Sequence, residues 1–297
     1  MNNYLTSCKL CPRNCKINRV LGEKGFCKAD NRIKIARNAL HFWEEPPISG
    51  TNGSGAVFFS YCNLGCVYCQ NYLISKQHNG IHISTEELAD IFIDLQSQSA
   101  HNINLVTPTH YIPQISSALE IAKIRGLKIP VIYNCGGYES VEGIKLLDGL
   151  IDIYMPDIKY FSDKYAIKYS KANNYFHYAT QALAEMFSQV GKNVFDKNNI
   201  MKKGVIVRHM LLPGLLFDSK KILDYLFKTY RDDIYISIMS QYTPMPECEK
   251  YPEISSSVKK EYYSTLISYA QDIGIKNAFI QDDGAVGESF IPEFYNE

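Results

Sequence analysis

The chain has 297 residues, 46% of them hydrophobic, and its 31 Lys and Arg balance its 31 Asp and Glu. That length and apolar content suffice to bury a sizeable core. The balanced charge gives no indication of a nucleic acid or an acidic membrane as partner. No apolar run approaches the ~18 residues of a membrane helix, and no apolar secretory segment opens the chain, so we expect a cytoplasmic protein.

Short β-rich runs alternate with longer helical patterns, which is typical of βα units around a parallel sheet. The predicted strands cover residues 56–60, 103–107, 130–134, 151–155, 205–210, 234–240 and 278–281. The predicted helices cover residues 85–97, 112–125, 141–147, 179–190, 219–230 and 258–273. Ser84 and Glu87 provide a capping box for the first helix, and Gly126 ends the second. The pattern predicts an α/β fold, an incomplete (β/α) barrel of about six parallel strands over residues 51–297.

Two segments do not follow this alternation. Residues 1–50 carry four cysteines and little periodicity, which predicts a small metal-stapled cap at the N-terminus. Residues 160–203 are rich in Tyr, Asn and Lys and are too long for a simple connection. We expect this stretch to contain two helices and to reach over the substrate side of the barrel.

Three cysteines, Cys62, Cys66 and Cys69, follow the first predicted strand with the spacing C-x3-C-x2-C. An odd total of nine cysteines argues against a disulfide framework. Zinc knuckles usually combine two close cysteines with a second, distant pair. An open 4Fe–4S cluster fits best, because three thiolates leave one of the four irons free to bind another molecule.

Polar side chains and turn formers also follow the other predicted strands. They include Thr107, Thr109 and His110 after the second strand, Asn134 and Cys135 at the third, Asp157 and Lys159 after the fourth, and Gln241 after the sixth. In parallel barrels the functional groups gather at the C-terminal ends of the strands. We therefore expect these residues to converge on one site.

The chain resembles the radical S-adenosylmethionine (SAM) superfamily, and more narrowly the uncharacterised iron-sulfur proteins related to pyruvate formate-lyase activating enzymes. The likeness spans nearly the whole chain and rests on the Cys triad with Tyr68 before its last cysteine, on Cys8-x2-Cys11-Pro12-Arg13-x-Cys15, and on residues 41–47, 53–55, 69–71, 105–110, 154–159 and 207–210. The resemblance implies that the triad ligates a 4Fe–4S cluster whose open iron chelates SAM. One electron would then cleave SAM, and the deoxyadenosyl radical would remove a substrate hydrogen in a closed, dry pocket.

The resemblance also implies roles for several side chains. Tyr68 is expected against the adenine, and Lys159 near the SAM carboxylate unless it is simply solvated. Asp157 would orient Lys159 or bind the ribose, with a helix-initiating Asp as the alternative, and Asn134 would contact SAM or form a turn. Where many family members have Gly-Gly-Glu, this chain has Thr107-Pro108-Thr109, whose hydroxyls and carbonyls we expect to accept from the SAM ammonium.

Four further residues carry weaker expectations. Arg208 lies in an apolar strand, so it should pair with a carboxylate or a substrate anion. His209 reads as a hydrogen-bonded core histidine. Cys135 is expected to face the site, and Cys248 to be a loop residue without a role.

The N-terminal cysteines Cys8, Cys11, Cys15 and Cys27 supply four thiolates within twenty residues. Four ligands close a tetrahedral zinc site, which we favour slightly, or an auxiliary iron-sulfur cluster.

The resulting hypothesis is a radical SAM enzyme that abstracts hydrogen from a protein or peptide backbone, as in the activation of a glycyl radical enzyme. The resemblance implies a flavodoxin- or ferredoxin-type electron donor as partner. The alternative is modification of a peptide or a small metabolite. A non-catalytic electron carrier is disfavoured, because it needs four protein ligands for its cluster and no pocket.

Overall fold

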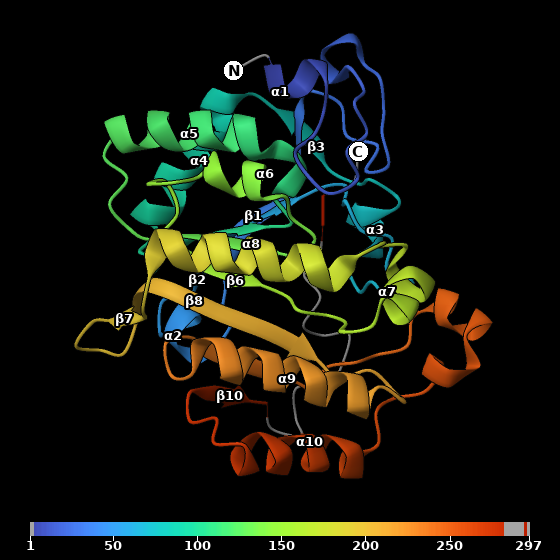
Figure 1. The fold of residues 1–297 in the computed structure, drawn as a ribbon. Coiled ribbons are helices and arrows are strands. Elements are labelled where there is room, and N and C mark those ends of the chain that lie inside the picture. The colour runs from blue at the N-terminus through green and yellow to red at the C-terminus, as the bar shows by residue number, and fades with distance from the viewer. Residues whose placement is uncertain (1–2, 282–293, 296–297) are drawn as a thin grey trace.

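A curved, largely parallel sheet organises the chain, and the computed structural model describes residues 3–281 and 294–295 (Figure 1). Within these residues, seven neighbouring strands run parallel in sequence order: β2 (Ser54–Phe59), β4 (Ile103–Val106), β5 (Val131–Cys135), β6 (Ile153–Pro156), β8 (Met201–Met210), β9 (Tyr235–Met239) and β10 (Ala278–Ile280). Each overlaps a strand predicted from the sequence. The predicted parallel sheet is therefore confirmed.

Three antiparallel strands were not predicted: β1 (Ile33–His41), β3 (Ile81–Ile83) and β7 (Val194–Phe195). β1 pairs with β2 and with β3, and β7 pairs with β8. The sheet order is β10-β9-β8-β6-β5-β4-β2-β1-β3, and among the described strands β3 and β10 do not pair with each other. The barrel is thus open between these two edges, as an incomplete barrel requires.

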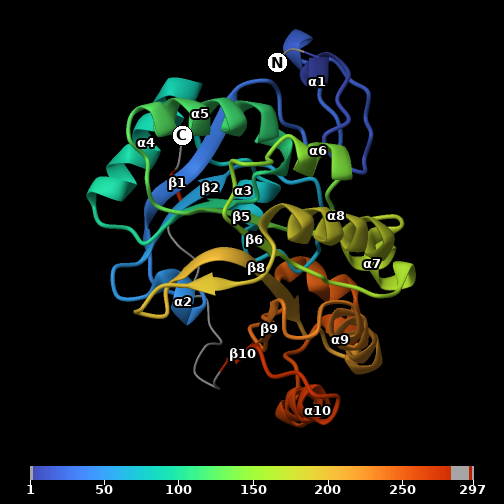
Figure 2. The ribbon, with the colours of Figure 1, turned by 60° about the vertical axis from the view of Figure 1, so that its left-hand side comes forward.

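Helices cover the outer side of the curved sheet (Figure 2). The helices of the described residues are α1 (Asn3–Thr6), α2 (Pro46–Ser49), α3 (Tyr72–Ser75), α4 (Thr85–Ser97), α5 (Ile112–Ile124), α6 (Val141–Lys145), α7 (Asp163–Ser170), α8 (Tyr175–Val190), α9 (Leu216–Tyr230) and α10 (Lys260–Asp272). The short α2 differs from the covering helices, because its Ile48 packs in an inner apolar cluster. The capping box of α4 is present: Glu87 N–H donates to Ser84 Oγ at 3.1 Å, and Ser84 N–H donates to Glu87 Oε2 at 2.7 Å. No helix in the described part of the chain is long and apolar enough to cross a membrane.

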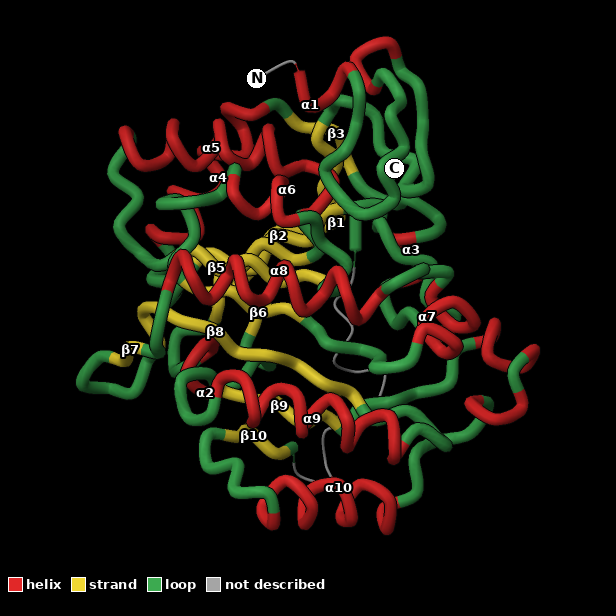
Figure 3. Tube along the Cα trace, viewed as in Figure 1, coloured by secondary structure: helices red, strands yellow, loops and turns green. Residues whose placement is uncertain are grey.

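The segments that departed from the βα pattern have distinct structures. Residues 160–203 contain the two expected helices, α7 and α8. The residues before β1 are mostly loop, with a short α1 and a 3-10 turn at Arg19–Leu21 (Figure 3). β1 itself lies within residues 1–50 and belongs to the main sheet. The division of the chain at residue 50 stays a prediction.

Two groups of buried apolar residues support this architecture. The larger one packs between the sheet and its helices and includes residues from every parallel strand except β10. A smaller inner cluster consists of Ile48, Ile132, Ile153, Met155, Met201 and Ile206. Side chains alternate along a strand, so residues two positions further on lie on the same face. Asn134, Asp157 and Arg208 thus follow directly above the inner cluster on β5, β6 and β8.

Candidate metal and cofactor site

A cavity of about 750 Å³ opens at the C-terminal ends of the parallel strands. Its lining includes eight of the residues for which the sequence predicted a cluster or SAM role: Cys62, Cys66, Tyr68, Cys69, Thr107, Asn134, Asp157 and Lys159. Cys135 lines it as well. Segments up to about a hundred residues apart in the chain are therefore brought to one place, at the end of the barrel where parallel αβ folds carry their sites.

Each sulfur of the cysteine triad has a hydrogen-bond partner. Leu64 N–H donates to Cys62 Sγ at 3.3 Å, Ser170 Oγ–H donates to Cys66 Sγ at 2.9 Å, and Ser75 Oγ lies 3.3 Å from Cys69 Sγ. Sulfurs that ligate iron commonly accept such bonds, which tune the cluster they hold. The donor set therefore fits an iron-sulfur cluster with three protein ligands.

The pKa shifts of two triad thiols, those of Cys62 and Cys69, also favour a bound metal cluster. Burial raises the pKa of the Cys62 thiol, and the charges of Cys66 and Cys69 raise it further. Burial likewise raises the pKa of Cys69. Three thiolates packed together out of water need a compensating cation, and iron binding deprotonates a coordinating thiol outright.

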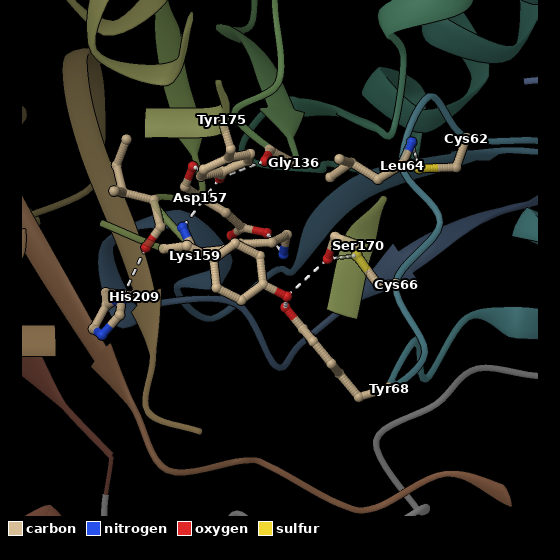
Figure 4. Close-up of polar contacts among 12 residues, drawn as sticks. Cys62, Leu64, Cys66, Tyr68, Gly136, Asp157, Lys159, Ser170, Tyr175 and His209 are labelled. Atoms are coloured by element: carbon tan, nitrogen blue, oxygen red, sulfur yellow. Dashed lines mark hydrogen bonds and ion pairs between the residues drawn. The ribbon is translucent and has the colours of Figure 1, made fainter. Parts of the chain in front are cut away.

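A chain of hydroxyl groups links Tyr68 to the triad (Figure 4). Tyr68 OH lies 2.5 Å from Tyr160 OH, which lies 2.7 Å from Ser170 Oγ, the donor to Cys66. Tyr160 and Ser170 are fully buried. The network fixes the Tyr68 ring in the cavity wall, where its edge meets the Tyr242 ring at a centroid distance of 6.0 Å.

Lys159 forms an ion pair with Asp157 beside the triad (Figure 4). Burial alone would lower the pKa of Lys159, but the charge of Asp157 outweighs it and raises that pKa, so the ammonium stays charged. The Lys159 side chain is only 19% exposed, so it is not simply solvated. Asp157 lies well before α7, which begins at Asp163, so it orients Lys159 and does not start a helix.

Tyr175, at the start of α8, fastens the loops that carry these groups. Lys159 N–H donates to Tyr175 OH at 3.0 Å. The same hydroxyl lies 2.8 Å from the carbonyl oxygen of Gly136 and 3.0 Å from that of Asp157, to which it donates. The ends of β5 and β6 are thereby held together at the cavity.

Two glycines after Asn134 permit this close packing. Gly137 has φ +77°, and a Cβ there would stand 2.0 Å from the carbonyl oxygen of Asp157. A Cβ on Gly136 would stand 2.6 Å from Leu64 Cδ1 in the triad loop. Only glycine fits at position 137, whereas a side chain at position 136 would require Leu64 to shift. The turn after β5 therefore packs closely against the Asp157 backbone.

The threonines of Thr107-Pro108-Thr109 separate. Thr107 lines the cavity in the left-handed region, at φ +60°, which is strained for a β-branched residue and typical of functional sites. Thr109 starts a 3-10 turn, Thr109–Tyr111, that turns its Oγ1 to donate to Glu139 Oε1 at 2.7 Å. It does not belong to the cavity lining, so its position does not support the predicted contact with SAM.

Glu139, the acceptor for Thr109, was not singled out from the sequence. It is buried, and burial raises its pKa to about 7. Tyr133 OH also donates to it, at 3.1 Å. Both contacts lie behind the cavity wall, where they join the ends of β4 and β5.

Arg208 and His209 lie where the sequence predicted. Arg208 pairs with the carboxylates of Glu44 and Glu45, as its apolar surroundings required. His209 is 2% exposed and donates from Nδ1 to the carbonyl oxygen of Ile158 at 2.7 Å. Burial lowers its pKa to about 4, so it is a neutral core histidine.

The four N-terminal cysteines line one small cavity together with Arg13, Arg19 and His110. Arg13 Nε donates to the carbonyl oxygen of Asn63 at 2.9 Å, next to the triad, and its guanidinium lies 3.6 Å from the Phe26 ring centroid. In the described residues, no three His, Cys, Asp or Glu side chains are grouped so that they could hold a single metal ion, and this holds for the triad as well as for these four cysteines. The metal at these cysteines stays a prediction.

Sequence reasoning missed several residues of the site and misjudged one cysteine. Tyr160, Ser170 and Tyr175 come from the Tyr-rich stretch after residue 160, whose composition was the only signal. Glu44 and Glu45 were noticed only as part of a family motif. Cys248, expected to be an idle loop residue, is fully buried and contacts Tyr242 OH at 3.5 Å.

Comparison with known proteins gives a family-level match. The family model of the Radical SAM superfamily matches residues 56–226. The uncharacterized protein MJ0674 of Methanocaldococcus jannaschii is 28% identical over 281 residues, which cover 91% of this chain and 75% of that protein. A second uncharacterized protein of the same organism, MJ0808, is 27% identical over 175 residues, covering 53% of this chain and 50% of that one.

Two solved structures share the fold. SuiB of Streptococcus suis bound to the precursor peptide SuiA superposes with a TM-score of 0.52 at 12% identity, covering 76% of this chain and 47% of that one. The FeFe-hydrogenase maturase HydG from Carboxydothermus hydrogenoformans gives a TM-score of 0.52 at 14% identity, covering 74% of this chain and 50% of that one. The chain thus spans about half the length of these solved chains, and at such identity the likeness concerns the fold alone.

Proposed function

The chain belongs to the radical SAM superfamily, and we propose that it uses this chemistry to take a hydrogen atom from a protein or peptide backbone, as in the activation of a glycyl radical enzyme. Membership makes it a radical SAM enzyme that works with a 4Fe–4S cluster and SAM. When bound, these two supply the one-electron chemistry that the side chains of the protein lack. The observation that carries the proposal is the triad, whose three sulfurs each have a polar partner at the end of β2 inside one cavity.

The protein's own residues position SAM and exclude water. The charged Lys159, oriented by Asp157, faces the cavity from the end of β6 and suits the SAM carboxylate. Asn134 adds an amide from β5, and Tyr68 adds an aromatic face for the adenine. Thr107 offers its hydroxyl and carbonyl to the SAM ammonium in place of the Gly-Gly-Glu contact.

A backbone substrate is supported by the open side of the sheet. Trp43 follows β1, the strand next to the β3 edge, and Ile280 lies in β10, the opposite edge; both line the cavity. Among the described residues they are large apolar side chains that remain 64% and 46% exposed. Exposed apolar groups beside a cavity suit a polypeptide that approaches from outside.

The second candidate is a small metabolite or a short peptide held within the cavity. A volume of about 750 Å³ lies within the range of small-molecule sites. Deuterium transfer separates the two. Reconstituted protein, SAM and a reductant are incubated with glycine-deuterated peptides of glycyl radical enzymes, and deoxyadenosine is examined by mass spectrometry. Deuterium in deoxyadenosine supports the backbone proposal, and transfer from a deuterated metabolite alone overturns it.

We also propose that Cys8, Cys11, Cys15 and Cys27 hold a second metal centre, either zinc or a second iron-sulfur cluster. Their common cavity and their contact with the triad loop through Arg13 support a shared site. Metal analysis distinguishes zinc from a second iron-sulfur cluster at these four cysteines. A cubane on the triad plus zinc gives about four irons and one zinc per chain, whereas two cubanes give about eight irons. Four irons without zinc would refute a second centre.

The one-electron chemistry needs a reductant, and we propose a flavodoxin- or ferredoxin-type protein as the donor. SAM cleavage should proceed with such a protein in its reduced form as well as with dithionite. Turnover with dithionite but with no protein of either class would contradict this partner.

A further inference from the structure

Two glutamates and one arginine form a buried ionic cluster inside the large cavity. Arg208 Nε donates to Glu45 Oε1 at 2.8 Å, and Nη2 donates to Glu45 Oε2 at 2.6 Å and also to Glu44 Oε2. The side chains of Glu44 and Glu45 are only 7% and 6% exposed, and that of Arg208 is 14% exposed. All three residues line the cavity, and none of them is among the residues proposed to bind the cluster or SAM.

The two glutamates of this cluster lie toward the opposite end of the cavity from the cysteine triad. β1 runs antiparallel to β2, so the end of β1 pairs with the start of β2, whereas the triad follows the end of β2. Glu45 directly precedes α2, whose Ile48 belongs to the inner apolar cluster. Arg208 lies two residues beyond Ile206 of that cluster, on the same face of β8. Arg208 pairs in register with Asp157, and its side chain reaches from there to both glutamates. Glu44 and Glu45 therefore form the floor of the cavity.

The floor has two carboxyl groups for one guanidinium. Arg208 holds the pKa of Glu45 below its usual value, although burial alone would raise it. Both oxygens of Glu44 accept N–H bonds, one from Arg208 and one from Asn104 Nδ2 at 2.8 Å. Burial lowers the pKa of His41, which lines the same cavity, so its ring adds no positive charge at pH 7. Two carboxylates thus face one guanidinium.

Asn104 provides a second, independent indication of a missing group. It is fully buried on β4, on the same face as Val106, which lines the cavity. Its Nδ2 donates to Glu44, which fixes the amide beside the acidic pair. Its Oδ1 has no hydrogen-bond partner among the described residues. A buried acceptor without a donor is costly, and an N–H group placed there would satisfy it.

We propose that Glu44 and Glu45, supported by Asn104 behind the cavity lining, bind a cationic nitrogen group of the substrate, a primary ammonium or a guanidinium, at the floor of the cavity. Such a group supplies the positive charge and the N–H donors that the floor lacks. Trp43, which lines the same cavity, adds an aromatic side chain of the kind that favours cations. The inference rests on the proposed function, because the substrate must share the cavity with SAM.

The ammonium of SAM is the competing occupant of this floor. The triad lies at the opposite end of the cavity from the two glutamates, and a cluster held by Cys62, Cys66 and Cys69 would bind SAM at that end. Lys159 and Asp157 lie at the triad end as well, since both act in the electrostatics of the triad or its loop. Arg208 connects the Asp157 side of the cavity with the floor. We assign the floor to a second molecule, and the experiment measures the affinity of SAM separately.

The test is direct binding of simple cations to the anaerobically reconstituted protein with SAM and without reductant. The probes are n-butylammonium, n-butylguanidinium and neutral 1-butanol, followed by ligand-observed NMR or calorimetry. The wild type should bind at least one cation about tenfold more tightly than 1-butanol. Preference between the two cations identifies the ammonium or the guanidinium. Equal affinity for all three probes overturns the proposal.

Variants localise the binding. Glu44→Gln and Glu45→Gln should each lower the affinity for the preferred cation about tenfold and leave the affinity for 1-butanol unchanged. Glu249→Gln, an exposed glutamate outside the cavity lining, is the matched control and should have no effect. Loss of SAM affinity in Glu44→Gln with unchanged cation binding overturns the assignment in favour of SAM. If a variant does not fold, the proposal is still tested by whether the wild type binds a cation more tightly than 1-butanol.

The cationic site and the proposed function can be refuted independently of each other. No reductant is present, so cation binding is scored whether or not SAM can be cleaved. A protein that cleaves SAM but binds the three probes alike refutes the cationic site only. A protein that prefers cations but releases no methionine with reductant refutes the radical chemistry only.

Discussion

Replacing Arg208 by methionine should be strongly destabilising, because it leaves the two buried carboxylates of Glu44 and Glu45 without their positively charged partner. Arg208 donates twice to Glu45, at 2.8 and 2.6 Å, and also to Glu44, and both carboxylates are less than a tenth exposed. Breaking a buried ion pair from one side costs about 3–5 kcal/mol. Urea unfolding of the reconstituted protein at pH 7.5 measures this cost as a change in the free energy of unfolding.

The matched control is Arg125→Met. Arg125 pairs with Asp90 in an exposed bridge, with side chains 39% and 69% exposed, so its loss should cost below about 1 kcal/mol. The two substitutions remove the same group from a buried and from an exposed pair. Their difference isolates the effect of burial.

The cost of Arg208→Met should also shrink on acidification. In the wild type Arg208 lowers the pKa of Glu45, so the stability it contributes is present above the ordinary glutamate pKa and is lost as pH falls. In the variant, burial acts without Arg208 and raises the pKa of Glu45, so the folded variant gains stability relative to its unfolded chain as pH falls. The gap should narrow between pH 7.5 and pH 5. A cost equal to that of Arg125→Met, or one independent of pH, would refute the reasoning.

Two further substitutions probe the site. Gly137→Ala should destabilise by about 3 kcal/mol or more, since its Cβ would meet the Asp157 carbonyl oxygen at 2.0 Å, while Gly149→Ala, at φ +73° with open space around it, should cost only about 1–2 kcal/mol by the same unfolding assay. Ser170→Ala removes the donor to Cys66 Sγ and should lower the reduction potential of the cluster by up to about 60 mV, measured by EPR-monitored titration; an unchanged potential would show that this bond does not tune the cluster.

Local signals were enough to predict the parallel sheet. Segments such as β5 and β8 contain runs of β-branched and aromatic residues, which favour strands, and both are strands in the structure. β1 (Ile33–His41) was missed because its alternation is irregular, and its strand state comes from pairing on both sides with β2 and β3. Pairing partners distant in sequence leave no local trace.

The candidate site divides in the same way. The cysteine spacing and the positions of Asp157 and Lys159 after a strand were readable, because each depends on a few consecutive residues. The SAM contact of Thr109 stays a prediction, and nothing in the sequence indicated the 3-10 turn that directs its hydroxyl toward Glu139. The pairing of Glu45 with Arg208 joins residues 163 positions apart, so only the fold could show it.

The most direct test of the account is reductive cleavage of SAM by the anaerobically reconstituted protein. With a strong reductant the wild type should release methionine and deoxyadenosine. A variant with Cys62, Cys66 and Cys69 replaced by alanine should release neither, since no thiolate remains to hold the cluster. Equal turnover by the two proteins would contradict the assignment of the triad, and so would no turnover by a wild type that carries its full iron content.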